Sequence, residues 1–196
     1  MSDERDEQRI VVGATGASGL PLLVQCLRII READGFRSCL IMSHGARTTL
    51  AWETGLGVDE VRALADEWYE PEEIGAGPAS GSYRTAGMIV VPCSMKTLAG
   101  IHSGYAETLL LRAADVTIKE QRPLVLCARE SPLSPIHLRN MQELSMIPGV
   151  RICPPMLTFY GNASTIEDMT YDVAARLLMP FGIEAPRYHR WNGLGE

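Results

Sequence analysis

The feature that most constrains the fold is a short apolar run near the start of the chain that leads into regularly spaced glycines. Residues 10–12 are apolar, and Gly13, Gly16 and Gly19 follow at three-residue intervals. Glycine tolerates positive φ angles, so this spacing predicts a sharp turn after a strand. Apolar residues then recur at helical spacing, with a proline in the first turn. They are Leu20, Leu23, Leu27 and Ile30, with Pro21 as the proline.

A helix that begins directly after such a turn offers free N–H groups and partial positive charge, which suit a phosphate. A glycine turn of this kind also occurs in α/β proteins without a nucleotide, and the spacing is looser than the strict dinucleotide fingerprint. Dinucleotide folds place an acidic residue after the second strand to hold the adenosine ribose. Here the strand expected at residues 38–42 is followed by Ser43. This favours a mononucleotide such as FMN over NAD.

Length and charge restrict the class of protein. The chain has 196 residues and a net charge of −6, with no basic tract, which argues against a nucleic-acid partner. No apolar run approaches the roughly 18 residues that cross a bilayer, and the start of the chain is acidic, unlike a secretory signal. We expect residues 1–8 to be a disordered acidic leader, residues 9–196 to form one FMN-binding domain, and the protein to be cytoplasmic without a membrane partner.

The cysteines give no sign of a metal site or of a disulfide. The five are scattered singly, mostly in apolar runs, with no C-x-x-C pair. We therefore expect them to be small core residues and expect no metal.

Apolar strands alternate with helical patterns along the rest of the chain, which predicts an α/β fold, a doubly wound (Rossmann-like) parallel sheet with helices on both faces. Further strands are expected at residues 88–92, 123–128 and 150–153. Helices are expected at 46–52, 58–68, 98–105, 112–119 and 137–147, and from about Thr165, where Ile166, Met169, Val173 and Leu177 form the expected buried stripe. The loop at 69–86 is too long for an idle connection, and residues 79–82 could close over a site.

Polar residues collect where these strands end, and parallel sheets bind ligands at that edge. Ser94 and Thr97 could cap a helix, contact a ligand, or do both. The simplest interpretation of Glu53, near a helix end, is a solvated carboxylate. The simplest interpretation of Arg112, Asp115 and Lys119 is a surface salt-bridge ladder. The strand-end residues, which predict a single site, are Gly13–Ser18, Ser43, Ser94–Thr97, Arg129, Glu130 and Tyr160.

Several motifs resemble those of the UbiX-type flavin prenyltransferases, long named as subunits of aromatic acid decarboxylases. The resemblance extends from Arg9 to about Gly193, and one extra residue near Gly149 departs from it. Residues 92–101 and the pair Arg190-Trp191 are most similar to the branch associated with phenolic acid decarboxylases. The motifs are Thr15-Gly16-Ala17-Ser18-Gly19 and residues 41–43, 92–101, 112–115, 122–126 and 159–160.

The resemblance implies an FMN-binding homo-oligomer, typically a dodecamer. Such an enzyme joins a dimethylallyl group from its phosphate ester to N5 and C6 of reduced FMN and supplies a UbiD-type decarboxylase. The resemblance assigns FMN contacts to Gly16, Ala17, Ser18, Ser43, Ser94, Met95, Lys96, Thr97 and Arg129. It assigns the donor phosphate to Lys119, Arg129, Glu130, Tyr160 and Arg176, with Arg112 close by and some of these from a neighbouring chain. The resemblance assigns proton handling to Ser18 and Glu53. It also gives catalytic roles to Glu130 and to Trp191, an aromatic residue near the site.

Two other functions stay open at this point. One is a flavin-dependent decarboxylase of aromatic or phenolic acids, and the other is a subunit that only carries FMN. The phosphate-binding set has little use in the first and none in the second, so the prenyltransferase is favoured.

Overall fold

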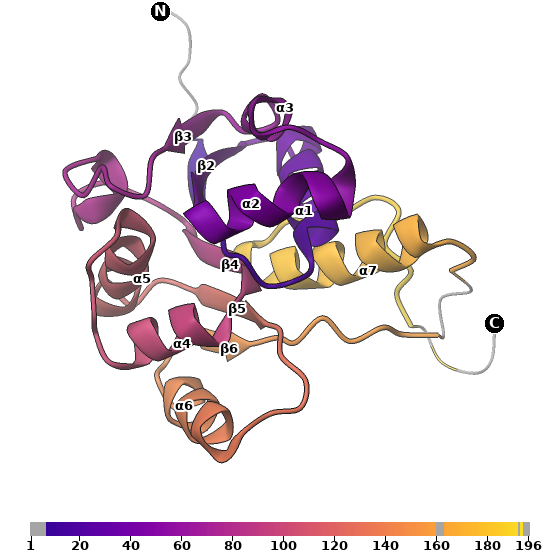
Figure 1. Cartoon of the computed structure of the whole chain (residues 1–196). Coiled ribbons are helices and arrows are strands. Elements are labelled where there is room, and N and C mark those ends of the chain that lie inside the picture. The colour runs from indigo at the N-terminus through magenta and orange to yellow at the C-terminus, as the bar shows by residue number, and fades with distance from the viewer. Residues whose placement is uncertain (1–6, 160–162, 192, 194–196) are drawn as a thin grey trace, which may run out of the picture.

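The computed structural model describes residues 7–159, 163–191 and 193, and in this part of the chain six parallel strands form one sheet (Figure 1). Their order across the sheet is β3-β2-β1-β4-β5-β6, with every neighbouring pair parallel. The strands are β1 (Gln8–Ala14), β2 (Phe36–Met42), β3 (Glu67–Tyr69), β4 (Gly87–Cys93), β5 (Leu124–Ala128) and β6 (Val150–Ile152). The helices are α1 (Leu20–Glu32), α2 (His44–Thr54), α3 (Val58–Arg62), α4 (Met95–His102), α5 (Leu109–Lys119), α6 (Pro135–Ser145) and α7 (Ile166–Leu178).

Helices cover both faces of the sheet, which confirms the predicted doubly wound fold (Figure 1). Successive side chains of a strand point to opposite faces, so each buried strand contributes to two cores. Val12 and Leu40 pack with α1 and α7, whereas Val11 and Ile41 pack with α4 and α5 on the other face. This is why strands in such a sheet are apolar at every position.

The chain reverses its direction of travel across the sheet between β1 and β4, and the loops that follow these two strands are joined by Thr15. This residue is 2% exposed. Its hydroxyl donates to the carbonyl oxygen of Pro92 at 2.8 Å and accepts from the N–H of Ser94 at 2.8 Å. In open α/β sheets the ligand binds in the crevice at this reversal, outside the carboxyl ends of the strands. Thr15 therefore fixes the spacing of the two walls of that crevice.

Two expectations about the first half of the chain were wrong. The helix expected at 58–68 ends at Arg62, and residues 67–69 form β3, which pairs with β2. The aromatic side chains of Trp68 and Tyr69 favour a strand, and Arg62 stacks over the ring of Trp68 at 3.9 Å. Gly13 lies inside β1 and not in the turn, where its missing side chain leaves room for Met88 and Leu110.

Three further expectations needed correction. Residues 79–82 line neither of the clefts described below; Arg112 donates to the carbonyl oxygen of Ala79, and Arg122 donates to that of Gly81. On α7, Ile166 is 81% exposed, and Tyr171 replaces it in the buried stripe. β1 begins at Gln8, inside the expected leader, and residues 1–6 of that leader lie outside the described residues.

The expectation for the cysteines is confirmed in four cases, and Cys153 is half-buried. The described part of the chain contains no helix that is both long and apolar enough to cross a membrane.

We predict that Thr15→Val, which keeps the shape but removes the hydroxyl, will destabilise the fold. Buried polar groups at Pro92 and Ser94 would lose their partner, at a cost of about 1–3 kcal/mol. Thr15→Ser should cost about 0.8 kcal/mol, because it removes only a methyl group. Urea unfolding followed by circular dichroism measures both, and a Val variant as stable as the wild type would contradict the role given to the hydroxyl.

Candidate active site

Two clefts lie at the carboxyl edge of the sheet, on either side of the turn formed by Gly16, Ala17 and Ser18. Gly16 lines the larger cleft, of about 650 Å³, and Ser18 lines the smaller, of about 420 Å³. Ala17 lies between them in the chain. The turn predicted from the glycines is therefore shared by both clefts.

The larger cleft contains the N-termini of two helices. Ser43 caps α2 by accepting from the N–H of Ala46 at 3.2 Å, and Ser94 caps α4 by accepting from the N–H of Thr97 at 3.3 Å. Capping is confirmed for Ser94. The hydroxyl of Ser94 also donates a hydrogen bond to the hydroxyl of Thr97. Two helix N-termini give partial positive charge in one place, and the exposed Lys96 adds a full charge. This cleft therefore suits a phosphate.

Two other residues shape this cleft through the backbone. A side chain on Gly16 would meet the backbone of Gly45 at 3.0 Å, so the loop after β1 and the start of α2 approach each other closely. Met95 is 8% exposed and packs in the core, so only its backbone can face a ligand.

The N-terminus of α1 is not free, contrary to our expectation of a phosphate there. The carboxylate of Glu53, at the end of α2, accepts from the N–H groups of Gly19 at 2.8 Å and Leu20 at 2.9 Å. The interpretation of Glu53 as a solvated carboxylate was also wrong. The helix dipole and the two N–H groups that would attract a phosphate already hold this carboxylate.

The surroundings of Glu53 favour its ionised form. Burial acts to raise its pKa, but hydrogen bonds from Gly19, Leu20 and Ser18, together with the positive charge of Arg129, hold the pKa below its ordinary value. Glu53 is therefore a carboxylate at neutral pH, able to accept a proton but only weakly basic.

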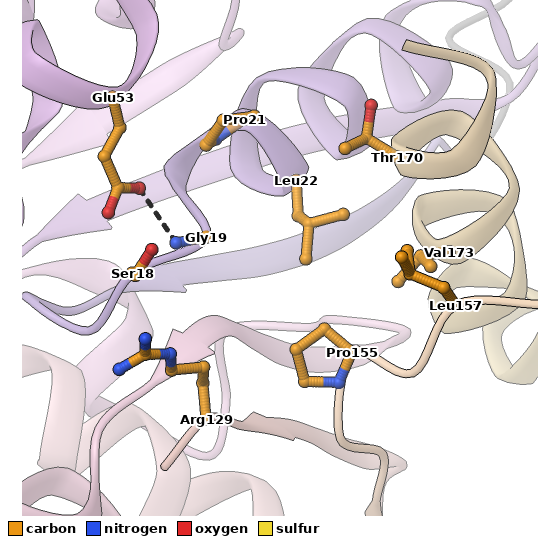
Figure 2. Close-up of a pocket in the computed structure, with 10 residues that line it drawn as sticks. All are labelled: Ser18, Gly19, Pro21, Leu22, Glu53, Arg129, Pro155, Leu157, Thr170 and Val173. Atoms are coloured by element: carbon orange, nitrogen blue, oxygen red, sulfur yellow. Dashed lines mark hydrogen bonds between the residues drawn. The ribbon is translucent and has the colours of Figure 1, made fainter. Parts of the chain in front are cut away.

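The smaller cleft brings Ser18, Glu53 and Arg129 to one end (Figure 2). Ser18 comes from the turn after β1, Glu53 from the end of α2, and Arg129 directly follows β5. The backbone N–H of Arg129 donates to the carbonyl oxygen of Cys93 at 3.1 Å, which ties its position to β4. Hydrocarbon side chains from α1, α7 and the segment after β6 form the remaining wall: Pro21, Leu22, Pro155, Leu157 and Val173, with Thr170.

The two cations on α5 line neither of the two clefts. Arg112 pairs with Asp115 at 2.6 Å, as the salt-bridge interpretation predicts, but Lys119 pairs with Glu120 and not with Asp115.

Among the described residues of the expected donor-phosphate set, Arg129 lines the smaller cleft, and Glu130 and Arg176 line neither of the two clefts. Glu130 is exposed beside Arg129, and Arg176 is exposed on α7, where its guanidinium contacts the sulfur of Met179 at 3.4 Å. Trp191 is 55% exposed and lines neither cleft, and Tyr160 lies outside the described residues.

Sequence reasoning missed two parts of the site, the Thr15 link and the apolar wall of the smaller cleft. Thr15 stands inside the glycine motif, so its position was a usable signal. The wall is built from α1, α7 and residues 155–157, and no local pattern marks such distant segments as neighbours. Within the described residues, no three His, Cys, Asp or Glu side chains are grouped so as to hold a metal.

We predict that Glu53→Gln will lower stability in a pH-dependent way. Because the folded pKa is depressed, the carboxylate stabilises the fold above its unfolded pKa, and the effect is lost as the pH falls through the folded pKa. The difference in thermal midpoint between variant and wild type should therefore be constant near neutral pH and shrink below about pH 4.3. Glu32→Gln, at the far end of α1, controls for removing a carboxylate, and a difference that stays constant down to pH 3 would contradict the assignment.

Comparisons with known proteins identify the family. A family model described as Flavoprotein matches residues 1–178. A probable UbiX-like flavin prenyltransferase of Streptomyces sp. (strain D7) is 54% identical over 186 residues, which are 95% of this chain and 92% of that protein.

Two solved structures share the fold over nearly the whole chain. A dodecameric FMN-dependent UbiX-like decarboxylase from Escherichia coli O157:H7 matches with a TM-score of 0.92 and 50% identity, covering 95% of this chain and 100% of that chain. AnUbiX (PadA1) in complex with FMN and dimethylallyl pyrophosphate matches with a TM-score of 0.92 and 46% identity, covering 95% and 98%. With the same sheet and the same family motifs, the chain belongs to the flavoprotein family and, within it, to the UbiX-like flavin prenyltransferases.

Proposed function

We propose that this chain joins a dimethylallyl group from dimethylallyl phosphate to N5 and C6 of reduced FMN, making prenylated FMN for a UbiD-type decarboxylase. The observation that carries the proposal is the smaller cleft, where Ser18, an ionised Glu53 and Arg129 face a wall of hydrocarbon (Figure 2). An allylic phosphate ester has two parts that match the two ends of this cleft: an anionic group, which Arg129 can bind, and a short apolar chain, which the hydrocarbon wall can bind.

The residues of the larger cleft fit the polar part of FMN. Ser43, Ser94, Thr97 and Lys96 would hold its phosphate at the starts of α2 and α4, and Gly16 lets the ligand approach the backbone. The N–H of Met95 lies at the same helix start. Ala17 and Ser18 lead from this cleft to the smaller one, where Arg129 would lie beside the flavin ring. FMN supplies the nucleophilic ring atoms.

The group transfer balances without an oxidant or a reductant. The carbon–oxygen bond of the donor breaks with its electron pair leaving on the phosphate, and new bonds form to N5 and C6. Two protons leave N5 and C6; one is delivered to the central carbon of the allyl group, and the other departs with the phosphate.

The charges around the smaller cleft suit these steps. Arg129 would stabilise the negative charge that develops on the leaving phosphate. Glu53 lies beside Ser18, whose hydroxyl helps to lower the pKa of the carboxyl group, and the pair suits a proton relay. Because the pKa of Glu53 is lowered, the departing inorganic phosphate, which is more basic than a carboxylate, is the stronger final acceptor of the proton.

We further propose that the active protein is a homo-oligomer, a dodecamer like the E. coli relative, with shared sites. Arg112 and Lys119 line neither of the two clefts of their own chain, which fits a role at the donor phosphate of a neighbouring copy. Arg176, Glu130, Tyr160 and the aromatic Trp191 would complete that site. The single domain at 9–196 and the cytoplasmic location remain predictions.

We expect Arg176→Ala and Lys119→Ala to retain bound FMN but to lose most prenylation, because each removes positive charge from the donor phosphate and none from the larger cleft. Flavin absorbance measures the first and mass spectrometry of extracted flavin the second. Arg28→Ala, an exposed arginine on α1, is the matched control. Full prenylation by both variants would remove them from the donor site.

The description of the E. coli relative as a decarboxylase keeps a second function in view. We predict that the purified protein alone releases no carbon dioxide from a cinnamic- or hydroxybenzoic-type acid. With reduced FMN and dimethylallyl phosphate it should restore activity to an apo UbiD-type decarboxylase. Glu53→Gln should weaken this restoration, since an amide cannot accept the proton. Release by this chain alone, at a rate the partner does not raise, would favour the decarboxylase.

A further inference from the structure

The smaller cleft has two chemically different ends. Ser18, Glu53 and Arg129 gather at one end, and Figure 2 shows Leu22, Leu157, Thr170 and Val173 on the opposite side. The polar groups that a flavin phosphate and ribityl chain require lie in the larger cleft. The apolar end is therefore left for hydrocarbon, which gains free energy by leaving water.

The wall that α7 contributes is hydrocarbon despite its threonine. The hydroxyl of Thr170 donates to the carbonyl oxygen of Glu167 at 2.9 Å, so its hydrogen is already used within the helix. Val173 lies three residues further on, on the same face of α7. Together the two residues present methyl groups to the cleft.

This wall is held firmly in place. Val173 packs against the core between the sheet, α1 and α7. On the other side of α7, the segment that follows it is bound to the helix. The N–H of Arg187 donates to the hydroxyl of Tyr171 at 3.3 Å, and the N–H of His189 donates to Asp172 at 3.4 Å. Leu157, by contrast, is 51% exposed on an irregular segment.

Resting on the proposed function, we propose that the apolar end binds the hydrocarbon chain of the allylic donor and that Val173 sets its length, favouring one isoprene unit over two. A cleft of about 420 Å³ lies toward the small end of ligand pockets, about 300–1,000 Å³. Val173 lies at the end of this cleft opposite Ser18, Glu53 and Arg129, so a donor whose phosphate is held at the polar end points the far end of its chain toward Val173. The bonds made and broken are the same for either donor, so only the fit of the chain differs.

The test is a competition between two donors. The full-length protein is incubated without oxygen with reduced FMN and equal concentrations of dimethylallyl phosphate and geranyl phosphate. Mass spectrometry of the extracted flavin then gives the ratio of ten-carbon to five-carbon product. Val173→Ala should raise this ratio about tenfold, and Val173→Leu should lower it by a similar factor. Ile166→Ala, an exposed position on the first turn of α7, should give the wild-type ratio.

The outcomes separate this inference from the function on which it rests. A ratio unchanged in both Val173 variants, with dimethylallyl transfer intact, would overturn the role of Val173. Absence of prenylated flavin from the wild type with either donor would instead overturn the proposed function. Val173→Leu keeps the core filled, so its ratio decides the question even if Val173→Ala fails to fold.

Discussion

The carboxylate of Glu53 joins the end of α2 to the start of α1 through the N–H groups of Gly19 and Leu20, and the shape of the smaller cleft depends on this contact. The contact satisfies N–H groups that a helix start leaves without partners. It also places a negative charge beside Arg129, which helps to keep Glu53 ionised. The side chain of Glu53 thus caps a helix and is also able to accept a proton. The larger cleft is instead lined by the helix N-termini of α2 and α4, which is why we propose that a phosphate binds there.

The overall fold could be predicted because a strand buried on both faces is apolar at every position, as in β4 and β5. β3 could not, because it has three residues and follows a helical pattern. Its strand state depends on pairing with β2, where Cys39 meets Glu67. For Val173 on α7, too, the local sequence predicted only part of the outcome. It was predicted as a core residue and does pack against the core, but it also lines a cleft. Its second role follows from the position of residues 155–157.

Within the site, local signals were sufficient for the helix caps and insufficient for long-range contacts. Ser43 and Ser94 stand directly before helices, and a hydroxyl there predicts a cap. Glu53 reaches a helix start more than 30 residues earlier in the chain, which no spacing rule indicates. The α5 cations are a third case. Arg112 and Lys119 are paired with Asp115 and Glu120 in the chain, and we propose that they serve the site of a second copy.

We propose that the two adjacent clefts bring a reduced flavin and an allylic phosphate together for carbon–nitrogen and carbon–carbon bond formation. Mass spectrometry of the flavin extracted after anaerobic incubation of the protein with reduced FMN and dimethylallyl phosphate tests it most directly. We expect a flavin heavier by one five-carbon unit, formed together with one equivalent of inorganic phosphate. Recovery of unmodified FMN only, from protein that is folded and saturated with flavin, would contradict it.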